Sequence, residues 1–105
     1  MNFQLGSTLL DACVLSVLSK GDTYGYVLTQ SIKNVVAISE STLYPVLRRL
    51  EKDNCLRVYD LPFAGRLRRY YSITESGREQ LERYREDWQI YKKCVDKLLL
   101  REDEA

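Results

Sequence analysis

The side chains best suited to chemistry in this sequence are arginines and lysines gathered in its middle third. Residues 40–73 carry seven Lys/Arg against four Asp/Glu, whereas residues 1–39 are neutral and residues 74–105 are net acidic. Such cations bind nucleic-acid phosphates, and arginine also pairs with the edge of guanine. The whole chain carries only +1, so the distribution of charge, rather than its total, points to nucleic acid.

The sequence offers little to an enzyme or to a metal site. It has no histidine, and Cys13, Cys55 and Cys94 are too scattered for a zinc motif. No glycine-rich phosphate loop or nucleophile–base pair is visible, and Asp11 and Asp22 are interpreted as a helix-start carboxylate and a turn residue. We therefore expect no catalytic residue, metal or cofactor. We expect instead a cytoplasmic protein with buried, reduced thiols and no membrane span.

Hydrophobic periodicity then predicts the elements that must position the basic residues. In chain order they are helices over about 8–19, 23–34 and 39–53, strands over 56–59 and 67–73, and a helix over 74–100. Ser39 and Thr74 are predicted N-caps, and Asn54 is predicted to end the third helix in the left-handed conformation. The fold class is mainly α with a small β-hairpin turning at 62–65. This order of elements predicts a winged helix-turn-helix DNA-binding domain, residues 1–73. A C-terminal dimerisation helix and an acidic tail, residues 74–105, are expected to follow it.

The third predicted helix carries the first group of candidate DNA contacts. A helical wheel gives it an apolar stripe, expected to face the core, at Leu43, Val46, Leu47 and Leu50. The remaining surface presents the candidates Ser41, Thr42, Tyr44, Pro45, Arg48, Arg49 and Lys52. Short side chains at its start would let the helix approach the major groove, where Tyr44 and Arg48 read bases and Lys52 binds phosphate.

The hairpin carries the second group of candidate DNA contacts. Just past its tip lie Arg66, Arg68 and Arg69. A winged-helix hairpin places such residues against the phosphate backbone or the minor groove, so the two basic groups together favour duplex DNA. The alternative is an ordinary solvated surface, in which Arg49 and Lys52 pair with the acidic residues at 51 and 53.

The last predicted helix repeats apolar residues at steps of three and four. The repeat consists of Leu81, Tyr84, Trp88, Tyr91, Val95 and Leu98. This heptad pattern is typical of a helix that pairs across a dimer, and ~27 residues span about 40 Å, more than one small domain can cover. Bulky rings in the middle of the seam leave two possibilities open, namely an aromatic dimer core without a cavity or a slot at the two-fold axis.

Two blocks of sequence closely resemble the PadR family of bacterial transcriptional regulators. They are TLYPVLRRLE at 42–51 and RRYYSITESG at 68–77, and further similarity at 6–10 and 21–26 extends the resemblance over nearly the whole chain. The resemblance implies a homodimeric repressor that binds a pseudo-palindromic operator in double-stranded DNA. One departure is Asn54, where the family usually has glycine.

The single C-terminal helix is similar to a short subgroup that includes multidrug-responsive repressors. In those proteins a tryptophan at the position of Trp88 stacks across the dimer and sandwiches planar aromatic drugs. Carried over, this resemblance implies a ligand pocket formed by Ala12, Ser16, Trp88, Tyr91 and Lys92, with Lys92 as a rim charge. A competing hypothesis for the whole chain is a winged-helix protein–protein adaptor that does not bind DNA.

Overall fold

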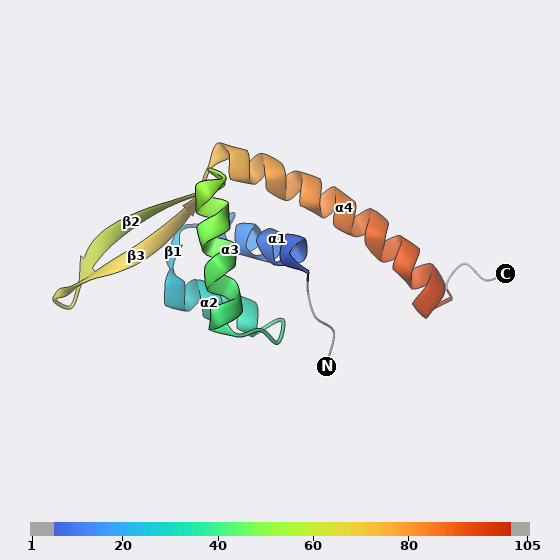
Figure 1. Ribbon diagram of the computed structural model, residues 1–105, viewed down its shortest axis with the longest axis horizontal. Helices are drawn as coiled ribbons and strands as arrows, with labels where there is room; N and C mark the ends of the chain where they lie inside the picture. The colour runs from blue at the N-terminus through green and yellow to red at the C-terminus, as the bar shows by residue number, and fades with distance from the viewer. Residues whose placement is uncertain (1–5, 102–105) are drawn as a thin grey trace.

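Three short helices meet in one core, from which a hairpin and a long helix extend in different directions (Figure 1). The computed structural model describes residues 6–101. Its elements are α1 (Ser7–Leu18), β1 (Thr23–Tyr24), α2 (Gly25–Lys33), α3 (Glu40–Lys52), β2 (Leu56–Phe63), β3 (Arg66–Ile73) and α4 (Glu75–Leu99). The prediction of a mainly helical winged helix with a long C-terminal helix is confirmed.

The core forms where the apolar stripes of these helices face one another. α1 contributes the fully buried Val14, Leu15 and Leu18, and α2 contributes Leu28 and Ile32. α3 adds its predicted stripe, and Leu81 of α4 reaches the same cluster. Because α1 lies at the centre and contacts α2, α3 and α4, it is the element through which the other helices are held together.

The end of α3 and the start of α4 are tied to each other. Asn54 has φ 61°, as predicted, and the Cys55 N–H donates to the Leu50 carbonyl at 2.8 Å, which closes the last turn of α3. The Thr74 hydroxyl accepts from the Gly77 N–H at 3.0 Å and donates to the Asn54 carbonyl at 2.6 Å. A Cβ on Gly77 would lie 2.3 Å from the Cys55 carbonyl oxygen, so only glycine permits this approach.

The start of α3 differs in detail from the sequence prediction. Ser39 occupies the N-cap position, but its hydroxyl does not cap a backbone N–H. It lies 3.0 Å from the Ser41 hydroxyl and 2.9 Å from the Thr42 hydroxyl instead. These three side chains therefore form a small hydroxyl cluster at the N-terminal start of α3. This is the part of the helix that a groove-binding helix would bring closest to DNA.

The sheet is larger than the predicted hairpin. β2 and β3 pair in register from Leu56↔Ile73 to Phe63↔Arg66, and the turn is only Ala64 and Gly65, both with positive φ, which suits a tight hairpin. Pro62, expected in the turn, lies within β2, where an edge strand tolerates it. The sequence analysis also missed β1, which pairs with β3 and makes the sheet three-stranded.

Candidate nucleic-acid interface

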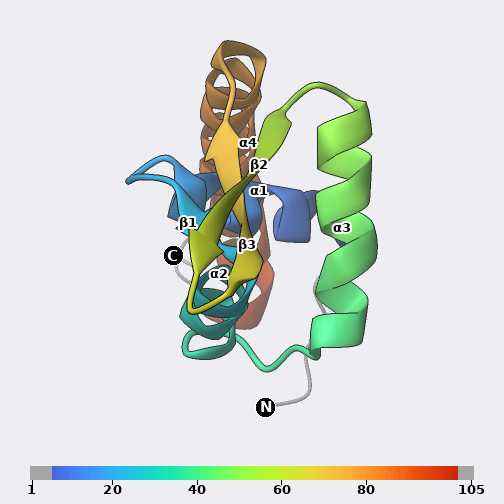
Figure 2. The same ribbon diagram turned by 90° about the vertical axis from the view of Figure 1, so that its left-hand side faces the viewer.

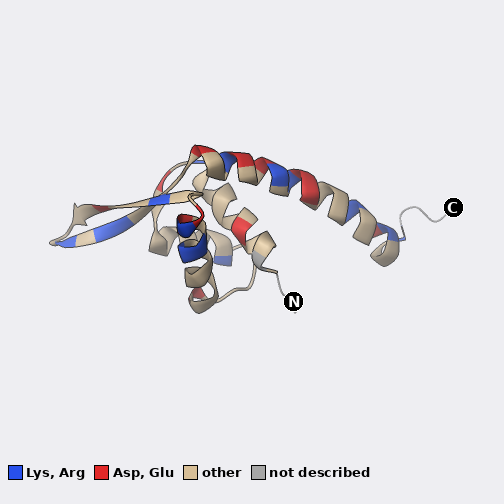
Figure 3. Ribbon diagram, turned by 45° about the horizontal axis from the view of Figure 1, so that its top comes forward, with Lys and Arg blue, Asp and Glu red and all other residues tan. Residues whose placement is uncertain are grey.

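The exposed surface of α3 runs from a small, polar start to a basic end. The predicted apolar stripe of α3 is buried, whereas the remaining side is exposed at Ser41, Thr42, Tyr44, Pro45, Arg48 and Lys52. Viewed from the hairpin end, α3 flanks the hairpin (Figure 2). The Lys and Arg positions of α3 and of the hairpin are marked in Figure 3. We call this exposed surface of α3 the α3 outer face.

The α3 outer face and one face of the hairpin come together at Tyr71. Burial raises the pKa of the Tyr71 hydroxyl, and the nearby Arg69 and Arg48 guanidinium groups oppose that rise. Arg48 belongs to α3 and Arg69 to β3, so both elements place a cation near one tyrosine.

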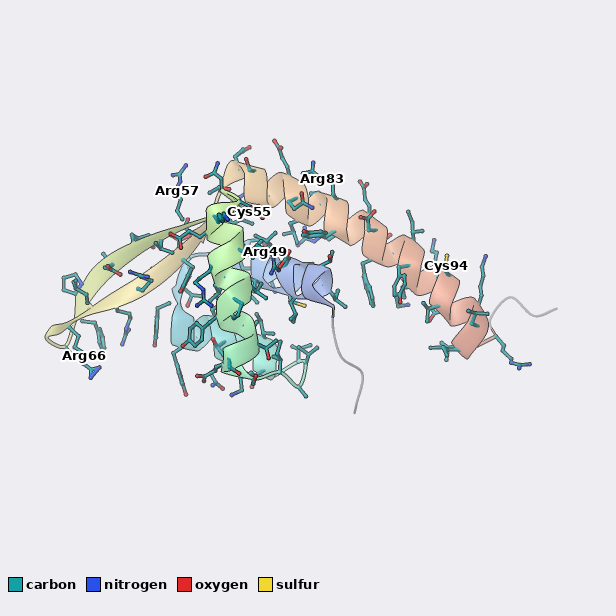
Figure 4. The ribbon with its side chains drawn as sticks, in the orientation of Figure 1. Arg49, Cys55, Arg57, Arg66, Arg83 and Cys94 are labelled. Carbon is teal, nitrogen blue, oxygen red and sulfur yellow. The ribbon has the colours of Figure 1, made fainter. Side chains whose placement is uncertain are left out.

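The strand register separates the three hairpin arginines. Successive side chains of a strand point to opposite faces, so Arg66 and Arg68 share one face of β3 while Arg69 shares the other with Tyr71. Arg66 lies beside the tip (Figure 4). The Arg69 Nε lies 3.5 Å from the Asp60 Oδ1 atom. Residues adjacent in sequence thus do not form one patch.

Arg68 lies in an aromatic setting on the hairpin face opposite Arg69. Its guanidinium carbon is 3.9 Å from the centre of the Tyr24 ring and 3.6 Å from that of the Phe63 ring. The Tyr59 and Tyr70 rings stack nearby at 5.5 Å. Cation–π contacts of this kind hold a guanidinium in place while leaving its edge available for hydrogen bonds. Arg68 is therefore a preorganised cation.

Arg49 lies where α3 packs on α1 and binds a carboxylate there (Figure 4). Its guanidinium pairs with Asp11 of α1, rather than with the acidic residues at 51 and 53. Asp11 is only 8% exposed and lies in the second turn of α1, so its interpretation as a helix-start carboxylate was wrong. Burial raises the pKa of Asp11, and Arg49 opposes that effect.

Asp11 also contacts the long helix. Its Oδ2 atom accepts a hydrogen bond from the Tyr84 hydroxyl of α4 at 3.4 Å. Burial and the Asp11 carboxylate raise the pKa of Tyr84, so its hydroxyl stays protonated as a donor. Asp22, interpreted from sequence as a turn residue, precedes β1 and accepts from the Tyr59 hydroxyl at 2.7 Å.

The apolar seam of α4 is covered only at its start. Leu81 is buried, and Tyr84 and Val95 are partly buried. Trp88, Tyr91 and Leu98 are 45%, 63% and 79% exposed in the single chain. Leu99 beside the seam is also exposed, as are Ile90 on another side of α4 and Leu100 just after it. The outer half of α4 therefore presents apolar surface that no other part of residues 6–101 covers.

An open groove of about 420 Å³ lies between α1, the end of α2 and the first half of α4. It brings together Ala12, Ser16 and Trp88 of the predicted pocket, along with Tyr84. Tyr91 and Lys92 lie outside its lining. The Tyr91 ring lies 6.3 Å from that of Trp88, and the Lys92 ammonium lies 3.3 Å from Asp96. We call this space the α1–α4 groove.

Residues 6–101 contain no cluster of His, Cys, Asp and Glu side chains that could hold a metal ion. Cys13 and Cys55 are at least partly buried, as expected, but Cys94 is exposed, contrary to the prediction of buried thiols. No helix in this described part of the chain is both long and apolar enough to cross a membrane.

Comparison with known proteins places this geometry in one family. The model of the transcriptional regulator PadR-like family matches residues 14–83. The protein Smu.1704 of Streptococcus mutans is 38% identical and has a TM-score of 0.85, with 94% of this chain and 93% of that chain covered. A PadR family transcription regulator of Clostridium difficile is 30% identical with a TM-score of 0.78, covering 86% and 97%. The transcriptional regulator Rv3488 of Mycobacterium tuberculosis is 36% identical over 65% of this chain and 64% of its own length. The chain belongs to the PadR-like family of transcriptional regulators, which are DNA-binding proteins rather than enzymes.

Proposed function

We propose that this protein is a homodimeric repressor that reads a pseudo-palindromic operator in the cytoplasm. Residues 1–73 form its DNA-binding domain and residues 74–105 its dimerisation region. The observation that carries the proposal is the α3 outer face, which combines small polar residues, Tyr44 and Arg48 beside a hairpin that carries further arginines. α3 enters the major groove with Tyr44 and Arg48 toward the bases.

Phosphate contacts supply most of the affinity and set the register. Lys52 at the end of α3 and Arg66 near the hairpin tip are exposed cations, and Arg69 lies on the hairpin face that adjoins α3. Each phosphate that such a side chain neutralises contributes about −0.9 to the slope of log affinity against log salt. Base contacts then decide which duplex is preferred.

Dimerisation through α4 follows from the surface that it leaves uncovered. Trp88, Tyr91 and Leu98 are exposed at heptad spacing, and pairing with a second α4 would bury them. Two copies of α3 would then face neighbouring turns of DNA, roughly 34–36 Å apart. The two-fold symmetry of such a dimer would match the two half-sites of a pseudo-palindromic operator.

A planar aromatic ligand in the α1–α4 groove is the proposed inducer. The groove is lined mainly by apolar side chains, and the Trp88 ring at its edge offers a stacking surface. A ligand can release the repressor only if it binds one arrangement of the two subunits better than the other. An aromatic dimer core that fills the groove and binds no ligand is the second candidate.

The test is fluorescence anisotropy of a labelled duplex from the region upstream of the gene, compared with a scrambled duplex at several salt concentrations. The proposal predicts tighter binding to the upstream duplex and a steep loss of affinity with salt. Equal, weak binding to both duplexes by a protein that co-purifies with another protein would favour the adaptor function instead.

A further inference from the structure

A polar link of three side chains, Asp11, Arg49 and Tyr84, joins the proposed DNA-reading helix to the long helix. Arg49 of α3 pairs with one oxygen of Asp11, and the Tyr84 hydroxyl of α4 donates to the other at 3.4 Å. Asp11 itself belongs to α1 and is almost completely buried. A single buried carboxylate therefore holds one side chain from each of the two helices that the proposed function uses.

The two ends of the link lie beside the two proposed sites. Arg49 is adjacent in sequence to Arg48 of the α3 outer face but is turned toward α1. At the other end, Tyr84 lines the α1–α4 groove one helical turn before Trp88. A shift of α4 at the groove would move the Tyr84 hydroxyl relative to Asp11.

We propose that Asp11 and Arg49 are positioning residues that set the orientation of α3 according to the position of α4, and that Arg49 does not contact DNA. The inference rests on the proposed function, because it concerns how operator binding is controlled. Each donor offsets part of the cost of burying a carboxylate, so loss of the Tyr84 hydroxyl leaves one Asp11 oxygen without its donor while Arg49 still pairs with the other. Withdrawal of Tyr84 therefore changes the energy with which Asp11 holds Arg49, and so changes the placement of Arg48 one residue away.

The competing role for Arg49 is a direct phosphate contact, and the two roles differ in sign. If Arg49 binds phosphate, Asp11 competes with DNA for it, and Asp11→Asn strengthens binding and steepens the salt dependence. If Arg49 positions α3, Asp11→Asn weakens binding to the preferred duplex while the salt slope stays the same. Asparagine keeps the size of the side chain, removes its charge and replaces one acceptor oxygen with a donor amide, so it can accept from only one of the two partners.

The experiment measures duplex binding and backbone hydrogen exchange for Asp11→Asn, Tyr84→Phe and the control Tyr26→Phe. Tyr26 is an exposed tyrosine of α2 outside the α3 outer face, the hairpin, the α4 seam and the α1–α4 groove, and its substitution also removes only a hydroxyl. We expect Asp11→Asn and Tyr84→Phe each to lower affinity for the upstream duplex about tenfold, a typical size for coupling between sites. The salt slope should stay unchanged, and Tyr26→Phe should bind like the parent chain.

Hydrogen exchange measures the effect of the link on α3 in the absence of DNA. It therefore distinguishes failure of the link from failure of the proposed function. The link predicts that Tyr84→Phe, still cooperatively folded, speeds amide exchange in the second half of α3, residues 47–52, whereas Tyr26→Phe does not. If α3 exchange responds but no duplex is preferred, the proposed function fails and the link stands. Unchanged α3 exchange in Tyr84→Phe, or stronger duplex binding by Asp11→Asn, would overturn the link.

Discussion

At the scale of single residues, the partner of a charged side chain decides what it can do. Arg48 and Arg49 are neighbours in the chain, but 100° of helical rotation separates them. Arg48 is exposed on the α3 outer face, whereas Arg49 pairs with a buried carboxylate. Arg68 differs again, because two aromatic rings hold its guanidinium. These arginines thus have three different roles.

The three thiols should differ in reactivity for the same reason. Burial raises the pKa of Cys13 and Cys55, so each forms less thiolate at pH 8 and is also harder for a reagent to reach. Cys94 is exposed on α4. Titration with an aromatic disulfide reagent at pH 8 should show one fast thiol that Cys94→Ser removes, and two slow thiols that speed up as the pH rises. Fast labelling of Cys55 in the folded protein would contradict this burial.

Sequence patterns identified the exposed candidates but not their partners. The helical wheel correctly assigned the buried stripe of α3 and left Tyr44 and Arg48 exposed. It could not identify Asp11 as the partner of Arg49, because 38 residues separate the two and neither helix encodes how it packs on the other. Ion pairs of this kind depend on tertiary geometry that no local periodicity contains.

At the scale of elements, α3 and the hairpin form one surface because both are anchored to the same core. The α3 stripe and Leu56 of β2 are buried in that core, and Tyr71 of β3 packs against it. The left-handed Asn54 sends the chain from α3 directly into β2. The orientation of the hairpin relative to α3 therefore follows from the way that α3 ends.

Two substitutions on α3 should distinguish a side chain that contacts bases from one that contacts phosphate. Arg48→Ala should reduce the difference in binding free energy between the upstream and the scrambled duplex. The expected reduction is about 1–3 kcal/mol, the contribution of one good arginine–guanine contact. Lys52→Ala should weaken binding to both duplexes alike and make the salt slope shallower by about 0.9. Anisotropy titrations at several salt concentrations measure both effects. If Arg48→Ala leaves the ratio unchanged, Arg48 does not read bases.

Periodicity predicted the long elements well and the short ones poorly. All four helices were found within a few residues of their ends, because each carries a repeating apolar stripe. β1 was missed because two residues are too few to show alternation. Both hairpin strands extend further toward the tip than predicted, because Pro62 was taken as a turn signal although an edge strand accepts it.

At the scale of the whole molecule, the chain is elongated, with extents of 63 × 29 × 20 Å. The hairpin and α4 account for that length, and the outer half of α4 extends well past the three-helix core (Figure 1). An isolated helix with exposed apolar side chains along one side gains stability by pairing. The apolar seam found in the sequence predicted this exposed surface.

Placing a charge on that seam should prevent the proposed dimer from forming. Leu98→Glu puts a carboxylate on the apolar seam of α4, whereas Lys93→Glu changes the charge on the opposite side of the same helix. Sedimentation velocity should show the parent chain and Lys93→Glu as dimers and Leu98→Glu shifted toward monomer. If Leu98→Glu sediments like the parent chain, α4 does not pair through this seam.

The most direct test of a symmetric, sequence-reading regulator is the number of chains on its preferred duplex. Sedimentation of the protein with the upstream duplex, and with a version carrying half a helical turn inserted between the half-sites, would measure it. We predict two chains per upstream duplex and a large loss of affinity on insertion, because the insertion rotates one half-site away from its α3. One chain per duplex, with equal affinity for both versions, would contradict the account.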